Sequence, residues 1–205
     1  CAVFFDLKSF AETPALLMEN EVWAYNKLFD ISEKIAGMVP TRSLVFLVCS
    51  NTPASIAAYV GFINHGIVPV MVDKELDEEL FQSLLEQYLP TYIFAEEAHF
   101  DFLDRYTQTL HIAGSVLYDL AEQHPFPLHD DLAILMTTSG STGSPKLVRQ
   151  SYENLRANTA SIAAYLHLDE TERAVMNLPL HYVYGLSVLN THLAVGASVV
   201  VTDKT

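Results

Sequence analysis

The sequence predicts an α/β fold of mostly parallel sheets covered by helices, arranged as two sheet-containing subdomains. Short, uninterrupted apolar runs are typical of strands covered on both faces, and they alternate with segments whose apolar residues recur at helical spacing. Such alternation predicts parallel strands joined by right-handed crossovers. A segment with two prolines, 124–131, is typical of a linker. This predicted linker separates a first subdomain, residues 1–123, from the start of a second, residues 132–205.

The first four elements follow from periodicity and from helix-ending residues. Apolar residues spaced as on one face of a helix predict a helix that ends at Gly37; they are Ala24, Leu28, Ile31 and Ile35. The apolar run Leu44–Cys49 predicts a central parallel strand. Thr52 and Pro53 then predict the cap and first turn of a second helix, which ends at Gly66. Pro69 interrupts the next strand, 67–72, which predicts an edge strand or a bulge there.

The rest of the first subdomain continues the same alternation. Residues 77–88 predict a helix with acidic residues in its first turn, where they suit the helix dipole. Its apolar stripe consists of Leu76, Leu80, Leu84 and Tyr88. Segments 91–95 and 114–117 predict two further short strands.

The second subdomain is predicted to begin with an apolar strand at 132–136, followed by a loop rich in hydroxyls and glycines. Ser151 predicts the cap of the next helix. The apolar face of that helix comprises Leu155, Thr159, Ile162 and Leu166. A strand at 174–178, a helix at 185–195 ended by Gly196, and a strand at 197–201 complete the prediction.

Composition argues against several classes of function. The 25 acidic and 11 basic residues give a formal net charge of -14, which disfavours nucleic acids and anionic membranes as partners. Cys1 and Cys49 lie far apart and match neither a disulfide framework nor a zinc cluster. The eight histidines show no metal-binding spacing, so no metal ligands are predicted. With no apolar run near the roughly 20 residues that span a bilayer, and no export signal, we expect a cytoplasmic protein.

Both ends of the sequence are expected to be cut. The chain opens at Cys1 without a methionine, and it stops at Thr205 just after a strand-like run. A processed, lipid-carrying cysteine is the alternative for Cys1, but no signal peptide is visible to support it. We therefore expect the second subdomain to be incomplete.

The loop at 137–146, T-T-S-G-S-T-G-S-P-K, contains the residue types that most clearly indicate a binding function. Hydroxyls can donate hydrogen bonds to phosphate oxygens, and glycines let backbone amides approach a phosphate without an intervening Cβ. The lysine at its end supplies a point charge. The loop is therefore predicted to hold the phosphates of a nucleotide.

Three other interpretations of this loop fit less well. A Walker loop needs glycine before its lysine and a hydroxyl after it, whereas Pro145 and Leu147 flank Lys146. A nucleophile elbow needs G-x-S-x-G, and the best frame begins with Ser139. A flexible polar linker fits the composition, but a linker does not need a lysine fixed after a proline.

The loop resembles the phosphate-binding signature of the adenylate-forming superfamily, which includes acyl-CoA synthetases, luciferases and the adenylation domains of peptide synthetases. The matching positions are Thr138, Ser139, Gly140, Ser141, Thr142, Gly143, Pro145 and Lys146. A second stretch, L-P-L-H-Y-V-Y-G-L at 178–186, is similar to the next signature of that superfamily. Earlier segments around Thr13, Trp23, Asn51 and His65 also fit, so the resemblance covers nearly the whole chain.

The sequence departs from the superfamily pattern at two places. Leu147 replaces the glycine that usually follows the signature lysine, and Tyr152 replaces a histidine. In the second signature, His181 and Tyr182 occupy positions usually held by an aromatic residue and a histidine. That pair lies against the acyl carboxylate in the superfamily, so the departure concerns the substrate pocket and leaves the phosphate loop intact.

The resemblance implies ATP-dependent activation of a small-molecule carboxylate as an acyl-adenylate, with release of pyrophosphate and transfer to the thiol of CoA or of a carrier protein. ATP and Mg²⁺ are the implied cofactors, with CoA as a further candidate. Implied ligands of the phosphates are Thr138, Ser139, Gly140, Ser141, Thr142, Gly143 and Lys146. Among these, Thr142 and Lys146 are implied to be catalytic. His181, Tyr182 and Gly185 are implied to bind the substrate.

Two expectations concern what the chain does on its own. Later superfamily segments for adenine, ribose and the C-terminal lysine do not occur before Thr205, so the chain alone is expected to be inactive. The alternative function is a non-catalytic nucleotide-binding or scaffold module derived from the same fold. The departures at Leu147, Tyr152 and His181 keep this alternative open.

Overall fold

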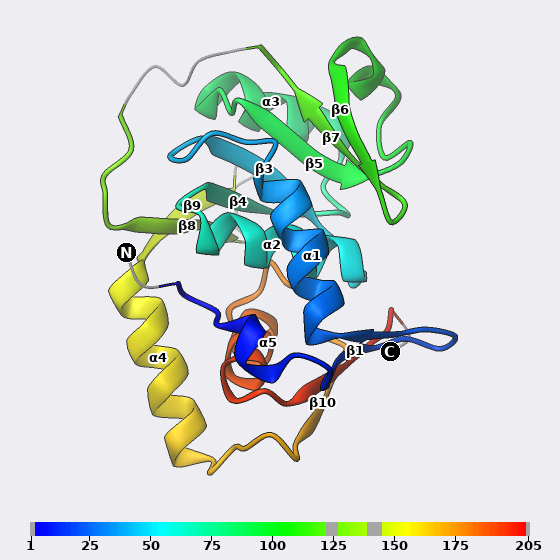
Figure 1. The fold of residues 1–205 in the computed structure, drawn as a ribbon. Coiled ribbons are helices and arrows are strands. Elements are labelled where there is room, and N and C mark those ends of the chain that lie inside the picture. Colours follow the sequence, from blue (N-terminus) through cyan, green and yellow to red (C-terminus); the bar gives the residue numbers. More distant parts are fainter. Residues whose placement is uncertain (1–2, 122–126, 139–144, 204–205) are drawn as a thin grey trace.

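The computed structural model describes residues 3–121, 127–138 and 145–203. It contains a seven-stranded sheet and a four-stranded sheet, with helices packed between and around them (Figure 1). The predicted α/β class with helix-covered sheets is confirmed.

The larger sheet has the strand order β6-β7-β5-β3-β4-β8-β9. These strands are β3 (Leu44–Cys49), β4 (Val68–Asp73), β5 (Tyr92–Glu96), β6 (Thr107–Ile112), β7 (Ser115–Asp119), β8 (Leu132–Thr138) and β9 (Lys146–Ser151). The central strands β5, β3, β4 and β8 run parallel, as predicted. Strand β9 at one edge and strands β7 and β6 at the other are antiparallel to their neighbours.

Strand β3 lies in the middle of this sheet and is buried along its whole length. Its side chains alternate between two cores, as expected for a strand. Val45 and Leu47 belong to the core that includes helix α2 (Pro53–Asn64). Phe46 and Val48 belong to the core on the other face, which includes helix α3 (Glu78–Tyr88). The continuous apolar run is therefore explained by helices on both faces.

Helix α2 is an internal helix that is buried from Ala54 to Ile63. On one side it packs against α1 (Tyr25–Ala36), where a Cβ on Gly61 would lie 2.4 Å from the carbonyl oxygen of Ser32. On another side the Tyr59 hydroxyl donates a hydrogen bond to Asn190 Oδ1 at 2.7 Å, on helix α5 (Val183–Val195). The helix therefore connects the larger sheet with the rest of the molecule.

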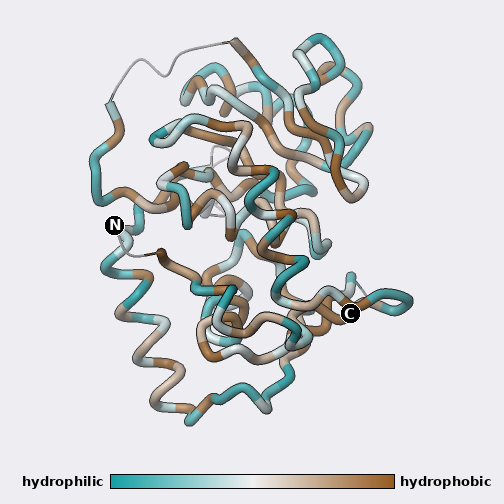
Figure 2. The backbone as a smooth tube through the Cα atoms, in the orientation of Figure 1, coloured by the Kyte–Doolittle hydropathy of each residue, from teal (hydrophilic) through white to brown (hydrophobic). Residues whose placement is uncertain are grey.

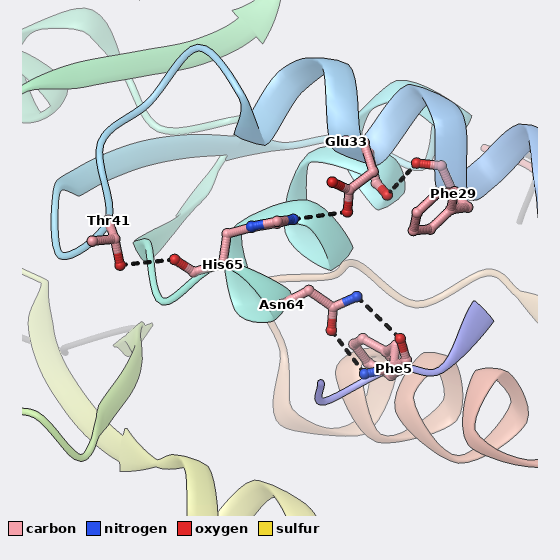
Figure 3. Close-up of polar contacts among 7 residues, drawn as sticks. Phe5, Phe29, Glu33, Thr41, Asn64 and His65 are labelled. Atoms are coloured by element: carbon pink, nitrogen blue, oxygen red, sulfur yellow. Dashed lines mark hydrogen bonds and ion pairs between the residues drawn. The ribbon is translucent and has the colours of Figure 1, made fainter. Parts of the chain in front are cut away.

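The C-terminal end of α2 is tied to three other segments (Figure 3). The Asn64 side chain accepts a hydrogen bond from the Phe5 backbone N–H at 2.8 Å and donates one to the Phe5 carbonyl oxygen at 3.1 Å. His65 Nε2 lies 2.7 Å from Glu33 Oε1 on α1. Thr41 donates its hydroxyl hydrogen to the His65 carbonyl oxygen at 2.9 Å. These contacts hold the N-terminal segment and the loop before β3 around α2.

The smaller sheet joins residues from opposite ends of the described chain. Its order is β10-β11-β1-β2, with β10 (Arg173–Met176), β11 (Ser198–Val201), β1 (Pro14–Leu17) and β2 (Val22–Ala24). Strand β11 runs parallel to both β1 and β10. The remaining elements are helix α4 (Tyr152–Tyr165) and the 3-10 helices at Leu7–Phe10 and Asp101–Arg105.

Several predicted element ends are confirmed. The Thr52 hydroxyl oxygen accepts a hydrogen bond from the Ser55 N–H at 3.3 Å, and Pro53 lies in the first turn of α2. Ser151 caps α4 by accepting from the Asn154 N–H at 3.1 Å. Gly196 ends α5 with a φ of 78°, a backbone conformation that favours glycine.

Sheet pairing corrects the prediction that a second sheet begins at residue 132. Strand β8 pairs in parallel with β4, with Val70 opposite Leu135, and so belongs to the larger sheet. The smaller sheet instead takes β1 and β2 from residues 14–24. Neither sheet is thus confined to residues 1–123 or to residues 132–205. An apolar run predicts a buried strand but carries no information about which distant strand is its partner.

The prediction of an edge strand or bulge at Pro69 is wrong. Strand β4 lies between β3 and β8, and Pro69 pairs in register with Val45. The Val68 N–H donates to the Ser43 carbonyl oxygen on the β3 side. Because successive N–H groups of a strand point to opposite sides, the missing N–H of Pro69 would point toward β8. The β8 pairing covers Val70 and Met71 and leaves Pro69 outside it.

Besides the antiparallel pair of β1 and β2, two hairpins of the larger sheet were not predicted. Strands β6 and β7 form one, whose turn residues Ala113 and Gly114 have φ values of 48° and 79°. Two positive φ values suit the tight turns of β-hairpins. The other consists of β8 and β9, which include the first two residues and the last residue of the segment 137–146, so a strand, rather than a helix, begins at Lys146.

Figure 2 shows hydrophobic residues along the strands of the larger sheet and hydrophilic residues in many of the peripheral connections. Among the described residues, none of the helices is both long enough and apolar enough to cross a membrane.

Candidate functional site

The described ends of the hydroxyl-rich loop are the last residue of β8 and the first residue of β9. Thr138 pairs with Lys146 across the two strands, and its hydroxyl donates a hydrogen bond to the Lys146 carbonyl oxygen at 3.1 Å. Both residues are exposed. The other predicted phosphate ligands lie outside the described residues, namely Ser139, Gly140, Ser141, Thr142 and Gly143.

The loop begins at the carboxyl edge of the parallel strands. Thr137 donates its hydroxyl hydrogen to the Met71 carbonyl oxygen at 2.8 Å, which fastens the end of β8 to β4. Met71 pairs with Met136, so Asp73 and Thr138 both lie two residues beyond this pair on adjacent strands. Open α/β sheets bind their ligands outside the carboxyl ends of the strands. The predicted phosphate loop therefore leaves the sheet at the edge where a ligand is expected.

Asn51, just beyond the end of β3, connects the two sheets at the same edge. Its side-chain amide donates to the Met176 carbonyl oxygen at 3.2 Å and to the Thr202 carbonyl oxygen at 3.3 Å. Met176 ends β10, and Thr202 follows β11. This contact brings the ends of strands from both sheets together.

His181 is brought to this edge by the turn between β10 and α5. It is 6% exposed, and its Nε2 lies 3.6 Å from Asp73 Oδ2 at the end of β4. Burial lowers the pKa of His181 below its ordinary value of 6.5, and the Asp73 carboxylate partly opposes that shift. No described atom hydrogen-bonds to its other ring nitrogen, Nδ1, which is also buried. His181 is thus a buried histidine, neutral near pH 7, that faces a carboxylate.

Tyr182 and Tyr184 lie on the outside of the same turn. Tyr182 is 48% exposed, and its ring centroid is 4.3 Å from that of His181. Tyr184 is 79% exposed, so it is not a core aromatic residue. The ring of Tyr182 is the one that lies against His181.

Gly185 has a clear packing role. A Cβ at this position would lie 2.3 Å from the carbonyl oxygen of Pro179, which is closer than van der Waals contact allows. The glycine therefore lets the turn that carries His181 lie directly against α5. Its predicted role in substrate binding stays a prediction.

The sequence analysis gave no site role to Asp73 or Cys49, which lie at the carboxyl ends of β4 and β3. An acidic residue directly after a buried strand was an available signal for Asp73. Burial raises the pKa of the Cys49 thiol, which disfavours the reactive thiolate form. Within the described ranges, no group of three or more histidine, cysteine or acidic side chains could hold a metal ion.

Comparison with known proteins identifies the class to which this fold and this loop belong. The sequence model of the AMP-binding enzyme family matches residues 6–205. The chain therefore belongs to the AMP-binding enzymes, the adenylate-forming superfamily that the two signatures predict.

CoA ligases are among the individual relatives. The chain is 29% identical over 203 residues to the 2-succinylbenzoate–CoA ligase of Bacillus pumilus, covering 94% of this chain and 41% of that protein. It is 30% identical over 115 residues to the long-chain-fatty-acid–CoA ligase of Bacillus subtilis, covering 53% of this chain and 20% of that protein. The chain thus spans about two fifths of the length of the first relative.

Solved structures share the fold at lower identity. The chain matches VinN with a TM-score of 0.78 at 22% identity, covering 98% of this chain and 56% of that one. It matches MatB from Rhodopseudomonas palustris with a TM-score of 0.82 at 16% identity, covering 98% of this chain and 44% of that one. The Bacillus subtilis o-succinylbenzoate CoA synthetase solved with ATP and magnesium has a TM-score of 0.76 at 23% identity, covering 97% of this chain and 57% of that one.

Proposed function

We propose that the protein carrying this chain activates a carboxylic acid with ATP, forming an acyl-adenylate and releasing pyrophosphate. The observation that carries this proposal is the family match across residues 6–205, within which the loop at 137–146 keeps the hydroxyl, glycine and lysine positions of the phosphate-binding signature. The CoA ligases among the relatives support the same class of reaction.

The residues at the described ends of the loop suit a polyphosphate to different degrees. Lys146 is exposed, and it makes no ion pair with another described residue, so its ammonium group can reach an anion. The Thr138 hydroxyl already donates its hydrogen to the Lys146 carbonyl oxygen. It would have to exchange that bond to donate to a phosphate. Lys146 is therefore the stronger candidate at these two positions.

In the proposed reaction, a carboxylate oxygen of the substrate attacks the α-phosphorus of ATP. The bond from that phosphorus to the bridging oxygen breaks, and pyrophosphate leaves. The chain's task is to position the reactants and to stabilise charge on the phosphate oxygens. Mg²⁺ bound with ATP would neutralise part of the phosphate charge. A thiol of CoA or of a carrier protein then attacks the acyl carbonyl, and AMP leaves.

The test is ATP–pyrophosphate exchange by the full-length protein and by its Lys146→Ala variant. Loss of a charge that stabilises the transition state is expected to lower the exchange rate about 100-fold or more. Lys34→Ala, which changes an exposed lysine on α1, is the matched control and should exchange at the wild-type rate. Equal rates for the Lys146 variant and the control would contradict the proposed role of the loop.

A non-catalytic nucleotide-binding or scaffold module is the second candidate. Tyr152 favours it, because this departure from the superfamily pattern is used structurally: its hydroxyl lies 3.3 Å from Arg42 Nη1. A scaffold would bind ATP with Mg²⁺ in a calorimetric titration yet show no pyrophosphate exchange with any acid. A catalytic protein would show both.

A further inference from the structure

His181 combines burial with an unused hydrogen-bonding atom. It lies at the carboxyl edge of the larger sheet, beside Asp73. Neighbouring strands are about 4.8 Å apart, so Asp73 is about one strand spacing from Thr138, where the hydroxyl-rich loop begins. The imidazole is therefore close to the proposed nucleotide site, although it is not part of the loop.

The position of Asp73 selects one tautomer of the ring. An ionised carboxylate can only accept hydrogen bonds, and it faces Nε2 at 3.6 Å. The neutral ring is therefore favoured with its hydrogen on Nε2. Nδ1 is then left with a lone pair and no hydrogen.

That lone pair has no partner among the described residues. Buried polar atoms in folded proteins are nearly always hydrogen-bonded, so an exception needs a reason. The ring of Tyr182, which is half exposed, lies against the imidazole. Movement of this exposed tyrosine would give a ligand access to the imidazole.

We propose that His181 Nδ1 accepts a hydrogen bond from the substrate, so that the site selects carboxylic acids that carry a hydroxyl or amino group over otherwise identical acids that lack one. This inference rests on the proposed acid-activating function and specifies its substrate class. A plain hydrocarbon acid leaves the buried nitrogen without a partner, whereas a hydroxyl or an amino group supplies the missing donor.

The experiment compares matched acids in ATP–pyrophosphate exchange by the full-length protein, using salicylate against benzoate and malate against succinate. The wild type is expected to prefer the hydroxylated acid of a pair by roughly tenfold or more in kcat/KM. In His181→Phe, which keeps a planar ring but has no lone pair, that ratio should fall to about one. Tyr165→Phe, a change at an 83% exposed residue on α4, is the control and should keep the wild-type ratio. A ratio unchanged in His181→Phe would overturn the inference.

A second variant separates hydrogen bonding from packing. Asp73→Leu removes the acceptor for the Nε2 hydrogen, so the ring hydrogen is no longer held there and can move to Nδ1. A substrate hydroxyl could still accept from Nδ1–H, so this variant is tested with an ammonium group, which can only donate, by comparing aspartate with succinate. The preference for the amino acid should then fall toward one, although His181 is still present. A full wild-type preference in this variant would count against the inference.

Nitrogen NMR of ¹⁵N-histidine-labelled protein tests the assignment without a substitution. The His181 resonances, assigned by their loss in His181→Phe, should show hydrogen on Nε2 and none on Nδ1. The opposite tautomer would overturn the inference even if the protein activates acids. Absence of exchange with every acid, together with the expected tautomer, would instead count against the proposed function.

Discussion

The Arg42 side chain joins distant segments of the chain by hydrogen bonds. Its Nη1 donates to the Gly66 carbonyl oxygen at 3.1 Å and to the Tyr152 hydroxyl at 3.3 Å. Its Nη2 donates to the carbonyl oxygens of His129 at 2.6 Å and Leu132 at 3.0 Å. The guanidinium group thereby joins the segments that lead into β4, β8 and α4. The planar fork of arginine is suited to several such acceptors at once.

Replacing Arg42 with alanine is expected to lower the free energy of unfolding by about 3 kcal/mol, because hydrogen bonds from a charged donor are each worth more than neutral ones. Arg42→Lys should recover only part of the loss, since an ammonium group lacks the fork that reaches acceptors on both sides. Urea unfolding of each variant measures the effect. Arg149→Ala, a change at an exposed residue of β9, is the control and should leave the midpoint nearly unchanged.

Individual residues differed in how far the sequence could place them. The roles of Thr52 and Ser151 as caps were predictable because capping depends on residues three positions away. For His181 the resemblance implied a role in substrate binding but gave no surroundings. Its carboxylate partner, Asp73, lies far earlier in the chain, so only the fold could bring the two together.

At the scale of elements, the turn between β10 and α5 determines where His181 lies. The Tyr182 N–H donates to the Pro179 carbonyl oxygen at 3.1 Å, which closes the turn against the start of α5. Gly185 leaves room for that carbonyl, since any side chain there would collide with it. The glycine of the second signature is thus explained by packing between a turn and a helix.

Gly185→Ala is expected to destabilise the protein by about 1–3 kcal/mol, because the new Cβ must push the backbone of the turn away. Thermal unfolding followed by circular dichroism measures this. Gly114→Ala is the comparison: no atom lies within 4 Å of its added Cβ, and its cost comes from a φ of 79° alone. That cost should be about 1–2 kcal/mol. If Gly185→Ala is as stable as the wild type, the turn is not packed as described.

Elements that are specified by residues close together in the chain were predicted well. Strands that depend on pairing with another strand were not. The buried strand Leu44–Cys49 and the helix that follows it were predictable from a continuous apolar run, a cap and a proline. Strand β9 was missed because its burial is only partial and its sequence, K-L-V-R-Q-S, has no clear alternation. Its pairing with β8 stabilises it as a strand.

At the scale of the whole molecule, the two sheets meet at the carboxyl edge of the parallel strands. Asn51 joins β3 to the ends of β10 and β11. The Tyr25 hydroxyl, at the start of α1, donates a hydrogen bond to the Ala197 carbonyl oxygen at a distance of 2.6 Å. The edge of the larger sheet where a ligand is expected is therefore also the place where the two sheets meet.

Asn51→Ala is expected to lower the free energy of unfolding by about 1–2 kcal/mol, since two part-buried carbonyl oxygens lose a donor. Asn51→Asp should be more destabilising, because a carboxylate would face the same two acceptors without a hydrogen to donate. Guanidinium unfolding monitored by Trp23 fluorescence compares both variants with the wild type. An aspartate variant as stable as the wild type would show that Asn51 does not join the sheets through these donors.

The sequence by itself determined the α/β class, most of the helices and buried strands, the phosphate-loop signature and membership of the adenylate-forming superfamily. Each of these depends on residues that are close together in the chain and that form periodic patterns, caps or ordered motifs. The tertiary structure alone decided that β8 joins the first sheet, that β1 lies beside β11, and that His181 faces Asp73. These contacts join segments far apart in the sequence. Their stability depends on burial and register across the whole molecule, which no local pattern encodes.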